Sequence, residues 1–275
     1  MKLQSVLLYL SLAVMSALIG QTMASERYIT LASTTSTENS GLFGHIVPLF
    51  TQKTGIEVRV VAVGTGQAFS IGRRGDADAL LVHDTRGEEQ FVADGYGVDR
   101  RDIMYNDFII VGPDADPAGV RAAADAEDAL RRIAESGSPF ASRGDDSGTH
   151  RKERALWASA DVEPKGGWYR ELGSGMGPTL NTAAAMNAYT LADRGTWLSF
   201  RNRQTLDLVF EGDEVLFNPY GSIIINPERH DHVKYGLARE WHEWLTSEEG
   251  RSAIAGFRVN GMPLFFPVTG SDQPR

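Results

Sequence analysis

Four short segments of the chain combine serine, threonine and glycine in a way that suits the binding of an anion. Each follows a strand-like or extended stretch and precedes a helix start. Glycine lets the backbone come close to a ligand, and the first turn of a helix carries unpaired N–H groups with a partial positive charge. Such a helix start is therefore a site for an anion. The four segments are residues 33–37, 64–67, 142–149 and 173–179.

A serine or threonine at a helix start also has a structural explanation, because its side chain caps the unpaired N–H groups of the first turn. For any one segment taken alone, that explanation is the stronger. Two of the segments fall in each of two predicted domains, however. The ligand crevice of an open α/β sheet lies at the carboxyl ends of its strands, where such loops gather. The set of four therefore favours a ligand.

Arg143 adds a full positive charge to the third segment. A guanidinium can donate two parallel hydrogen bonds to an oxyanion, and Arg143 precedes Ser147 and Thr149 on a compact loop. The alternative is an arginine that packs at the surface or between domains and is neutralised by Asp145 and Asp146. We expect the ligand role, with the two aspartates orienting Arg143 or capping the following helix.

The same loop contains the residue types of a catalytic triad, Ser147, His150 and Asp145. A productive triad usually brings together residues from separate segments, and the chain has no G-x-S-x-G nucleophile elbow. None of its five lysines has the glycine spacing of a P-loop. We therefore predict no catalytic residues and no enzyme activity, with a hydrolase as the least favoured alternative.

The histidines do not predict a site for a metal cation. His230, His232 and His242 lack the spacing of a standard site, and an exposed turn near Pro227 explains the first two. His150 follows the third segment, where it either adds positive charge or simply occupies a helix start. With no cysteine in the chain, disulfides, thiolate metal ligands and cysteine nucleophiles are excluded.

Composition and charge narrow the class of protein. The chain has 275 residues, of which 42% are hydrophobic, as is typical of a globular protein. Its 27 lysines and arginines against 36 acidic residues give a net charge of −9. This acidic balance, without a run of basic residues, argues against a nucleic-acid partner.

The N-terminus predicts a secretory signal peptide over residues 1–24. Lys2 precedes an apolar run at residues 7–19, and a small-x-small cleavage pattern ends at Ala24. The run is too short to span a bilayer, which argues against a membrane anchor. We expect a mature protein that is exported to the periplasm.

Short apolar runs alternate with amphipathic stretches after residue 27, which predicts βα units around a largely parallel sheet. The expected strands cover residues 28–31, 56–63, 79–82, 103–111 and 215–225. We also expect a helix over residues 114–135 and a surface strand or arm over residues 257–267.

The length of the mature chain predicts two domains. We predict that residues 26–106 and 218–275 form the first lobe and that residues 107–217 form the second. The chain would then cross between the lobes twice, and the two crossings would form the hinge.

Several motifs resemble those of tungstate-binding proteins of bacterial ABC importers. Residues 32–42 read ASTTSTENSGL, and residues 142–150 read SRGDDSGTH. Further matching motifs are residues 63–68, 75–84, 105–108 and 218–221. The resemblance covers nearly the whole mature chain in order. It implies an α/β type II periplasmic binding protein, with two α/β lobes of mixed, mostly parallel sheets joined by a two-segment hinge.

The resemblance also implies which residues hold the ligand. The implied donors are, from the first lobe, Thr34, Thr35 and Thr65 and, from the second lobe, Arg143, Ser147 and Thr149. Further candidates are Ser36, Gly66, Gly148 and Thr179, the last of which could instead cap its own helix. Ser33 departs from the family, which more often has threonine there, but it retains the hydroxyl.

The implied ligand is tungstate or molybdate, which a monomer without a cofactor would deliver to an ABC permease and its ATPase. Both anions are fully deprotonated near neutral pH, so their ideal site offers only donors, whereas phosphate keeps a proton and profits from a carboxylate. Asp78 and Asp84 could supply that acceptor, but a strand position and a helix cap explain them as well. Phosphate, sulfate and a role as an anion-sensing module are the alternatives.

Overall fold

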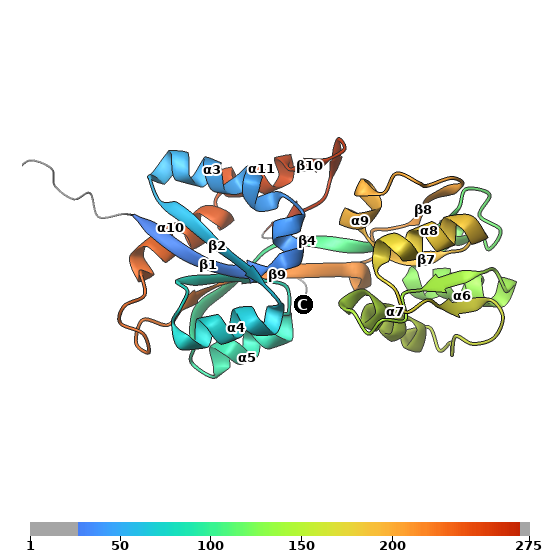
Figure 1. Ribbon diagram of the computed structural model, residues 1–275, viewed down its shortest axis with the longest axis horizontal. Coiled ribbons are helices and arrows are strands. Elements are labelled where there is room, and N and C mark those ends of the chain that lie inside the picture. Colours follow the sequence, from blue (N-terminus) through green and yellow to red (C-terminus); the bar gives the residue numbers. More distant parts are fainter. Residues whose placement is uncertain (1–26, 270–275) are drawn as a thin grey trace, which may run out of the picture.

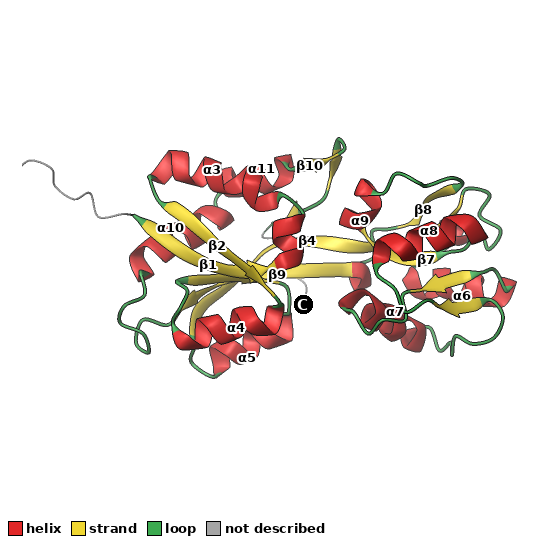
Figure 2. Ribbon diagram, in the orientation of Figure 1, coloured by secondary structure: helices red, strands yellow, loops and turns green. Residues whose placement is uncertain are grey.

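The computed structural model describes residues 27–269, so the predicted signal peptide lies outside the described residues. Figure 1 shows two lobes connected by the long strands β4 (Gly97–Pro113) and β9 (Phe217–Ile225). Helices surround the strands in both lobes (Figure 2). The two-lobed α/β architecture predicted from the sequence is confirmed.

A mixed sheet forms the centre of the first lobe. Besides β4 and β9, it contains β1 (Tyr28–Thr34), β2 (Glu57–Val63), β3 (Ala79–Val82) and β12 (Phe266–Pro267). Its strand order is β12-β4-β9-β3-β1-β2, with β1 parallel to both β2 and β3. β9 runs antiparallel to β3 and to β4, and β12 runs antiparallel to β4. In this lobe the expected parallel pairing is therefore confined to β1, β2 and β3.

Helices cover both faces of this sheet (Figure 1). They are α2 (Thr35–Asn39), α3 (Leu42–Thr54), α4 (Thr65–Arg74), α5 (Thr85–Ala93), α10 (Tyr235–Thr246) and α11 (Glu248–Gly256). α3, α10 and α11 share a buried core that includes Phe50 and Trp241, while α4 and α5 pack around Phe69 and Phe91. Across residues 27–269, no helix combines the length and apolar character that a membrane span requires.

The second lobe has its own core, which includes Phe140, Trp157 and Tyr189. Its elements are η1 (Val120–Ala122), α6 (Ala126–Ser136), β5 (Phe140–Ser142), α7 (Gly148–Ser159), β6 (Tyr169–Glu171), α8 (Met176–Met186), β7 (Thr190–Asp193), α9 (Arg194–Ser199), β8 (Leu206–Phe210) and η2 (Glu214–Leu216). β5 and β6 pair in parallel, while β7 and β8 pair antiparallel with the end of β4.

The single helix expected over residues 114–135 is wrong in its first half, which contains only η1. The Asp116 carboxylate accepts hydrogen bonds from the amides of Val120 and Arg121, both at 2.9 Å. Asp125 then caps α6 by accepting the Asp128 amide at 2.7 Å. Such local bonds between aspartate side chains and the backbone compete with helix formation, and here they divide the segment.

The two crossing strands pair with each other along most of β9. Their antiparallel register runs from Gly97 opposite Ile225 to Asp107 opposite Phe217. Asn106 lies opposite Asn218, whose Nδ2 donates to Asn106 Oδ1 at 2.8 Å. The predicted lobe boundaries fall at this asparagine pair, within two unbroken strands.

The C-terminal arm adds a contact with the second lobe that the prediction of two crossings did not contain. β10 (Arg258–Val259) and β11 (Met262–Pro263) form a hairpin whose turn residues, Asn260 and Gly261, have φ values of 52° and 81°. Asparagine and glycine favour this left-handed turn. Asn260 Nδ2 donates to the Leu198 carbonyl oxygen of α9 at 2.7 Å, which ties the arm to the second lobe.

Candidate anion-binding site

The first-lobe candidates gather at the carboxyl ends of three parallel strands. Thr34 ends β1, Thr65 begins α4 two residues after β2, and His83 directly follows β3. The parallel register of β1 with β2 and β3 puts these three strand ends at one edge of the sheet. An edge of this kind forms the ligand crevice of open α/β folds.

Thr34 and its neighbours form a small network of hydroxyl groups. Thr34 is the N-cap of α2, and its Oγ1 accepts the Thr37 amide at 3.3 Å. The same oxygen lies 2.7 Å from Thr37 Oγ1 and 3.0 Å from Ser36 Oγ. Thr34 is buried, whereas Thr35 and Ser36 are exposed. The structure thus engages Thr34 as a cap and leaves Thr35 and Ser36 on the accessible side of the loop.

α4 and α8 begin without a side-chain cap. Their N-cap residues are Gly64 and Gly175, and the space that a Cβ would occupy is open at both. Gly66, in the first turn of α4, is equally open, and Thr65 beside it is half-buried. These two helix starts therefore have room for a ligand oxygen close to the backbone.

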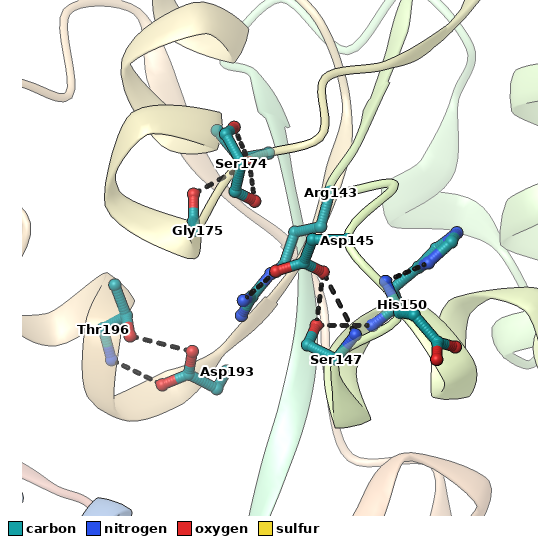
Figure 3. A network of polar contacts seen from close by, with 10 residues as sticks. Arg143, Asp145, Ser147, His150, Ser174, Gly175, Asp193 and Thr196 are labelled. Carbon is teal, nitrogen blue, oxygen red and sulfur yellow. Dashed lines mark hydrogen bonds and ion pairs between the residues drawn. The ribbon is translucent and has the colours of Figure 1, made fainter.

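In the second lobe, Asp145 accepts hydrogen bonds from the donors of the arginine loop, residues 142–149 (Figure 3). Arg143 Nε and Nη2 donate to Asp145 Oδ2 at 3.2 and 2.5 Å. The Ser147 amide and hydroxyl donate to Oδ1 at 3.2 and 2.6 Å. Asp145 therefore pairs with Arg143, a contact that is part both of the ligand interpretation and of the alternative of a neutralised arginine. Asp146 pairs instead with Arg151, on the exposed side of α7.

Asp145 stays ionised while it holds these donors. Burial raises the pKa of its carboxyl, but the hydrogen bonds from Arg143 and Ser147 outweigh burial and hold the pKa at about 2. Its four hydrogen bonds fill the lone-pair positions of a carboxylate. Arg143 gives two of its five N–H groups to this aspartate.

The remaining second-lobe candidates separate into exposed and buried positions. Gly148 begins α7 and is exposed, whereas Thr149 is 8% exposed. Thr179 is fully buried, and its hydroxyl donates to the Gly175 carbonyl oxygen at 3.0 Å. The Thr179 hydroxyl thus bonds to the start of its own helix. A backbone bond of 3.0 Å from the Ser174 amide to the Arg143 carbonyl oxygen holds the fourth segment against the arginine loop.

Ser147 and His150 do not make the contact that a catalytic triad requires. The Ser147 hydroxyl donates to Asp145, and His150 Nδ1 accepts the Asp146 amide at 3.0 Å. His150 is buried, with its Nε2 at 3.8 Å from Glu171 Oε1. The His150 ring therefore binds the backbone of the loop, and only the His150 amide donates to the Ser147 hydroxyl oxygen, at 3.3 Å.

The other histidines have structural partners as well. His242 Nδ1 lies 2.9 Å from Ser222 Oγ, both residues are fully buried, and burial lowers the pKa of His242 to about 4. Ring nitrogens of His230 and His232 lie 3.0 and 2.9 Å from backbone carbonyl oxygens. Within residues 27–269, no group of three or more His, Asp or Glu residues is arranged to hold a metal ion.

The two aspartates considered as phosphate acceptors are engaged elsewhere. Asp78 precedes β3, at the end opposite the crevice, and accepts the amides of Thr30 and Lys234, both at 2.7 Å. Asp84 caps α5 by accepting the Gly87 amide at 3.1 Å. These positions leave both carboxylates with backbone partners of their own.

One residue at the carboxyl ends of the parallel strands, His83, was not among the predicted site residues. Its Nε2 lies 3.2 Å from Ser36 Oγ, and its ring is half-buried. Burial lowers the pKa of His83 below its ordinary value. The signal that could have found it is its place directly after a buried strand, one position beyond the level of Thr34 at the end of β1.

Glu153 lies on α7, behind the arginine loop. It is 1% exposed, and its Oε1 accepts hydrogen bonds from Tyr169 Oη at 2.8 Å and from Trp157 Nε1 at 3.2 Å. Burial raises the pKa of this carboxyl from 4.5 to about 7, although those two donors act in the opposite direction. The folded protein therefore holds a proton on Glu153 at a pH where the unfolded chain has lost it.

Because the folded-state pKa is raised, the stability that Glu153 contributes is present below about pH 4.5 and is lost as the pH rises through 7. Glutamine at this position accepts the same two hydrogen bonds but does not ionise. We expect the free energy of unfolding of Glu153→Gln, relative to that of the wild type, to be about 1–3 kcal/mol higher at pH 8 than at pH 4.5. Urea unfolding at both pH values measures this, with Glu163→Gln at an exposed position as the control. An equal difference at the two pH values would contradict the raised pKa.

Comparison with known proteins identifies the superfamily and the family of this chain. Residues 20–249 match the PBP superfamily domain. The tungstate-binding protein TupA of Peptoclostridium acidaminophilum is 49% identical over 87% of this chain and 85% of its own length. The chain belongs to the TupA family. A second relative of this TupA-family protein, TupA of Campylobacter jejuni, is 37% identical over 84% of this chain and 87% of its own length.

Solved structures agree with this membership. The tungstate-binding protein TupA from Desulfovibrio alaskensis superposes on the TupA-family chain with a TM-score of 0.82 at 42% identity, covering 88% of this chain and 98% of that one. The structure of the tungstate ABC transporter from Geobacter sulfurreducens gives a TM-score of 0.69 at 49% identity, covering 84% and 99%.

Proposed function

We propose that this TupA-family protein captures tungstate or molybdate between its lobes in the periplasm and delivers the anion to an ABC permease and its ATPase. The proposed work is binding and release by a monomer, with no cofactor and no catalytic step. The relatives named for tungstate binding cover most of this chain, which supports the same ligand class here.

The arginine loop is the observation that carries this proposal. Asp145 holds the guanidinium of Arg143 and the hydroxyl of Ser147 in fixed positions, next to the exposed start of α7. Donors that are already ordered lose little conformational freedom when a ligand binds. A small tetrahedral oxyanion would accept the N–H groups of Arg143 that Asp145 does not use.

The carboxylates near the arginine loop already accept hydrogen bonds from protein groups, which favours a fully deprotonated anion as the ligand. Asp145 accepts four hydrogen bonds, and Asp193 at the start of α9 accepts both the amide and the hydroxyl of Thr196 at 2.8 Å (Figure 3). Asp84 is engaged as a helix cap. Phosphate would bring a proton that needs an acceptor, whereas tungstate and molybdate need only donors. A site whose nearby carboxylates are already occupied therefore discriminates against phosphate.

Closure of the lobes would complete the site. We propose that residues 26–106 with 218–275 and residues 107–217 turn against each other about β4 and β9, near the Asn106–Asn218 pair, as hinge closure around a ligand requires. Donors near Thr35, Thr65 and Gly66 would then face the arginine loop. Because the net charge of −9 opposes an anion at long range, affinity must come from short hydrogen bonds in a partly dry site.

Titration calorimetry of the purified protein with tungstate, molybdate, sulfate and phosphate tests the proposal. We expect tungstate and molybdate to bind, and sulfate and phosphate to bind at least about a hundredfold more weakly, a difference of about 2.7 kcal/mol. An affinity for sulfate or phosphate equal to that for tungstate would contradict the proposed selectivity and assign the site to tetrahedral oxyanions in general. No binding of tungstate at all would overturn it.

A further inference from the structure

His83 connects three elements, β3, α2 and β9. It follows β3, and its Nε2 lies 3.2 Å from the hydroxyl oxygen of Ser36 on α2. On its other side, the ring packs against Tyr220 of β9 with ring centroids 4.8 Å apart. The anion-facing loop of the first lobe is thereby joined to a strand that crosses between the lobes.

His83 is one of two partners that orient the hydroxyl of Ser36. The Ser36 side chain is exposed, and the other oxygen near it is Thr34 Oγ1 at 3.0 Å, which already accepts the Thr37 amide. A serine hydroxyl rotates freely unless its partners hold it. The partner on the side of the sheet is a half-buried ring held by Tyr220, which is 2% exposed. His83 is thus the rigid member of the pair.

We propose that His83 is a positioning residue for oxyanion binding, acting through Ser36. The imidazole fixes the Ser36 hydroxyl where it can contact the anion. The packing of the ring on Tyr220 keeps that hydroxyl at a fixed position relative to β9. The role of Ser36 as a donor rests on the proposed function. The charged group beside the ring is Asp84, on the same loop, and it is engaged as the cap of α5.

Two substitutions separate the polar contact from the packing of the ring. His83→Phe keeps an aromatic ring against Tyr220 but removes the nitrogen near Ser36, whereas His83→Gln places an amide group at about the position of Nε2. We expect His83→Phe to weaken tungstate binding about tenfold and His83→Gln to stay within about threefold of the wild type, by titration calorimetry. Thermal unfolding checks that each variant is folded, and His83→Leu replaces the phenylalanine variant if that one is not.

A double-mutant cycle with Ser36→Ala tests whether His83 acts through Ser36. If it does, Ser36→Ala costs much less affinity in the His83→Phe background than in the wild type, because the hydroxyl has already lost its orientation. Full additivity of the two losses, or a His83→Phe affinity equal to that of the wild type, overturns the inference. The proposed function survives that outcome, since it is judged by whether the wild-type protein binds tungstate, and a wild type that does not bind overturns both.

Discussion

Replacing Arg143 with alanine is expected to abolish measurable tungstate binding, with a loss of at least about a hundredfold in affinity. Two effects act in the same direction. The variant loses the guanidinium donors, and it leaves the Asp145 carboxylate without its cationic partner at the place where the anion would bind. The pKa of Asp145 is about 2 with Arg143 in place and rises when the arginine is removed, but an aspartate with its ordinary pKa of 3.8 is still charged at neutral pH. Titration calorimetry measures the loss.

Arg151→Ala is the matched control for this experiment. Arg151 belongs to the same part of the chain and also pairs with an aspartate, but its side chain is 69% exposed. We expect its removal to change the affinity by no more than about twofold. The double variant Arg143→Ala/Asp145→Asn separates the two effects, because it removes the unpaired charge as well, and we expect it to recover about tenfold of the loss. Unchanged affinity in Arg143→Ala would exclude this arginine from the site.

Replacing Arg194 with alanine is expected to lower the free energy of unfolding by about 3–5 kcal/mol. Arg194 Nε and Nη2 donate to the two carboxylate oxygens of Asp107 at 2.5 and 2.6 Å, and Nη2 also donates to Glu211. The side chains of Arg194 and Asp107 are 7% and 3% exposed. Truncation of the arginine leaves the Asp107 charge buried on the crossing strand β4 without its partner, which is far costlier than the loss of an exposed pair. Urea unfolding measures the change.

The exposed pair Arg121–Asp207 provides the comparison, since its side chains are 42% and 56% exposed. We expect Arg121→Ala to cost less than about 1 kcal/mol. The double variant Arg194→Ala/Asp107→Asn removes the buried charge together with its partner, and we expect it to be more stable than Arg194→Ala alone. A loss for Arg194→Ala no larger than that for Arg121→Ala would show that the Arg194–Asp107 pair is not buried in solution.

The local features of this protein follow from its sequence. Ser147 and Asp84 cap the helices that begin beside them, and the strand over residues 79–82 has the bounds that its apolar run predicts. Each of these depends on hydrogen bonds or burial within a few residues of chain, which is the range over which residue types and spacing act. The same range explains the division of residues 114–135, where local aspartate bonds that the periodicity did not reveal end one turn and start another.

The positions of the candidate site residues and of the buried ion pair depend on contacts between residues that are far apart in the chain. His83 meets Ser36, 47 residues away, because β3 pairs with β1 and not with β2, an order that the run of strands along the sequence does not specify. Arg194 meets Asp107 across 87 residues, and the C-terminal hairpin reaches α9 through Asn260.

The sequence by itself determined the helix starts within the four serine, threonine and glycine segments, the loop that carries Arg143 and the two-lobed α/β class. Only the tertiary structure decided that Asp145 accepts two of the guanidinium N–H groups, that Thr179 bonds within its own helix and that His83 lies beside Ser36. The physical reason is that a cap or a turn is stabilised by neighbours in the chain, whereas the partner of a side chain in a crevice is set by strand order and burial across the whole fold.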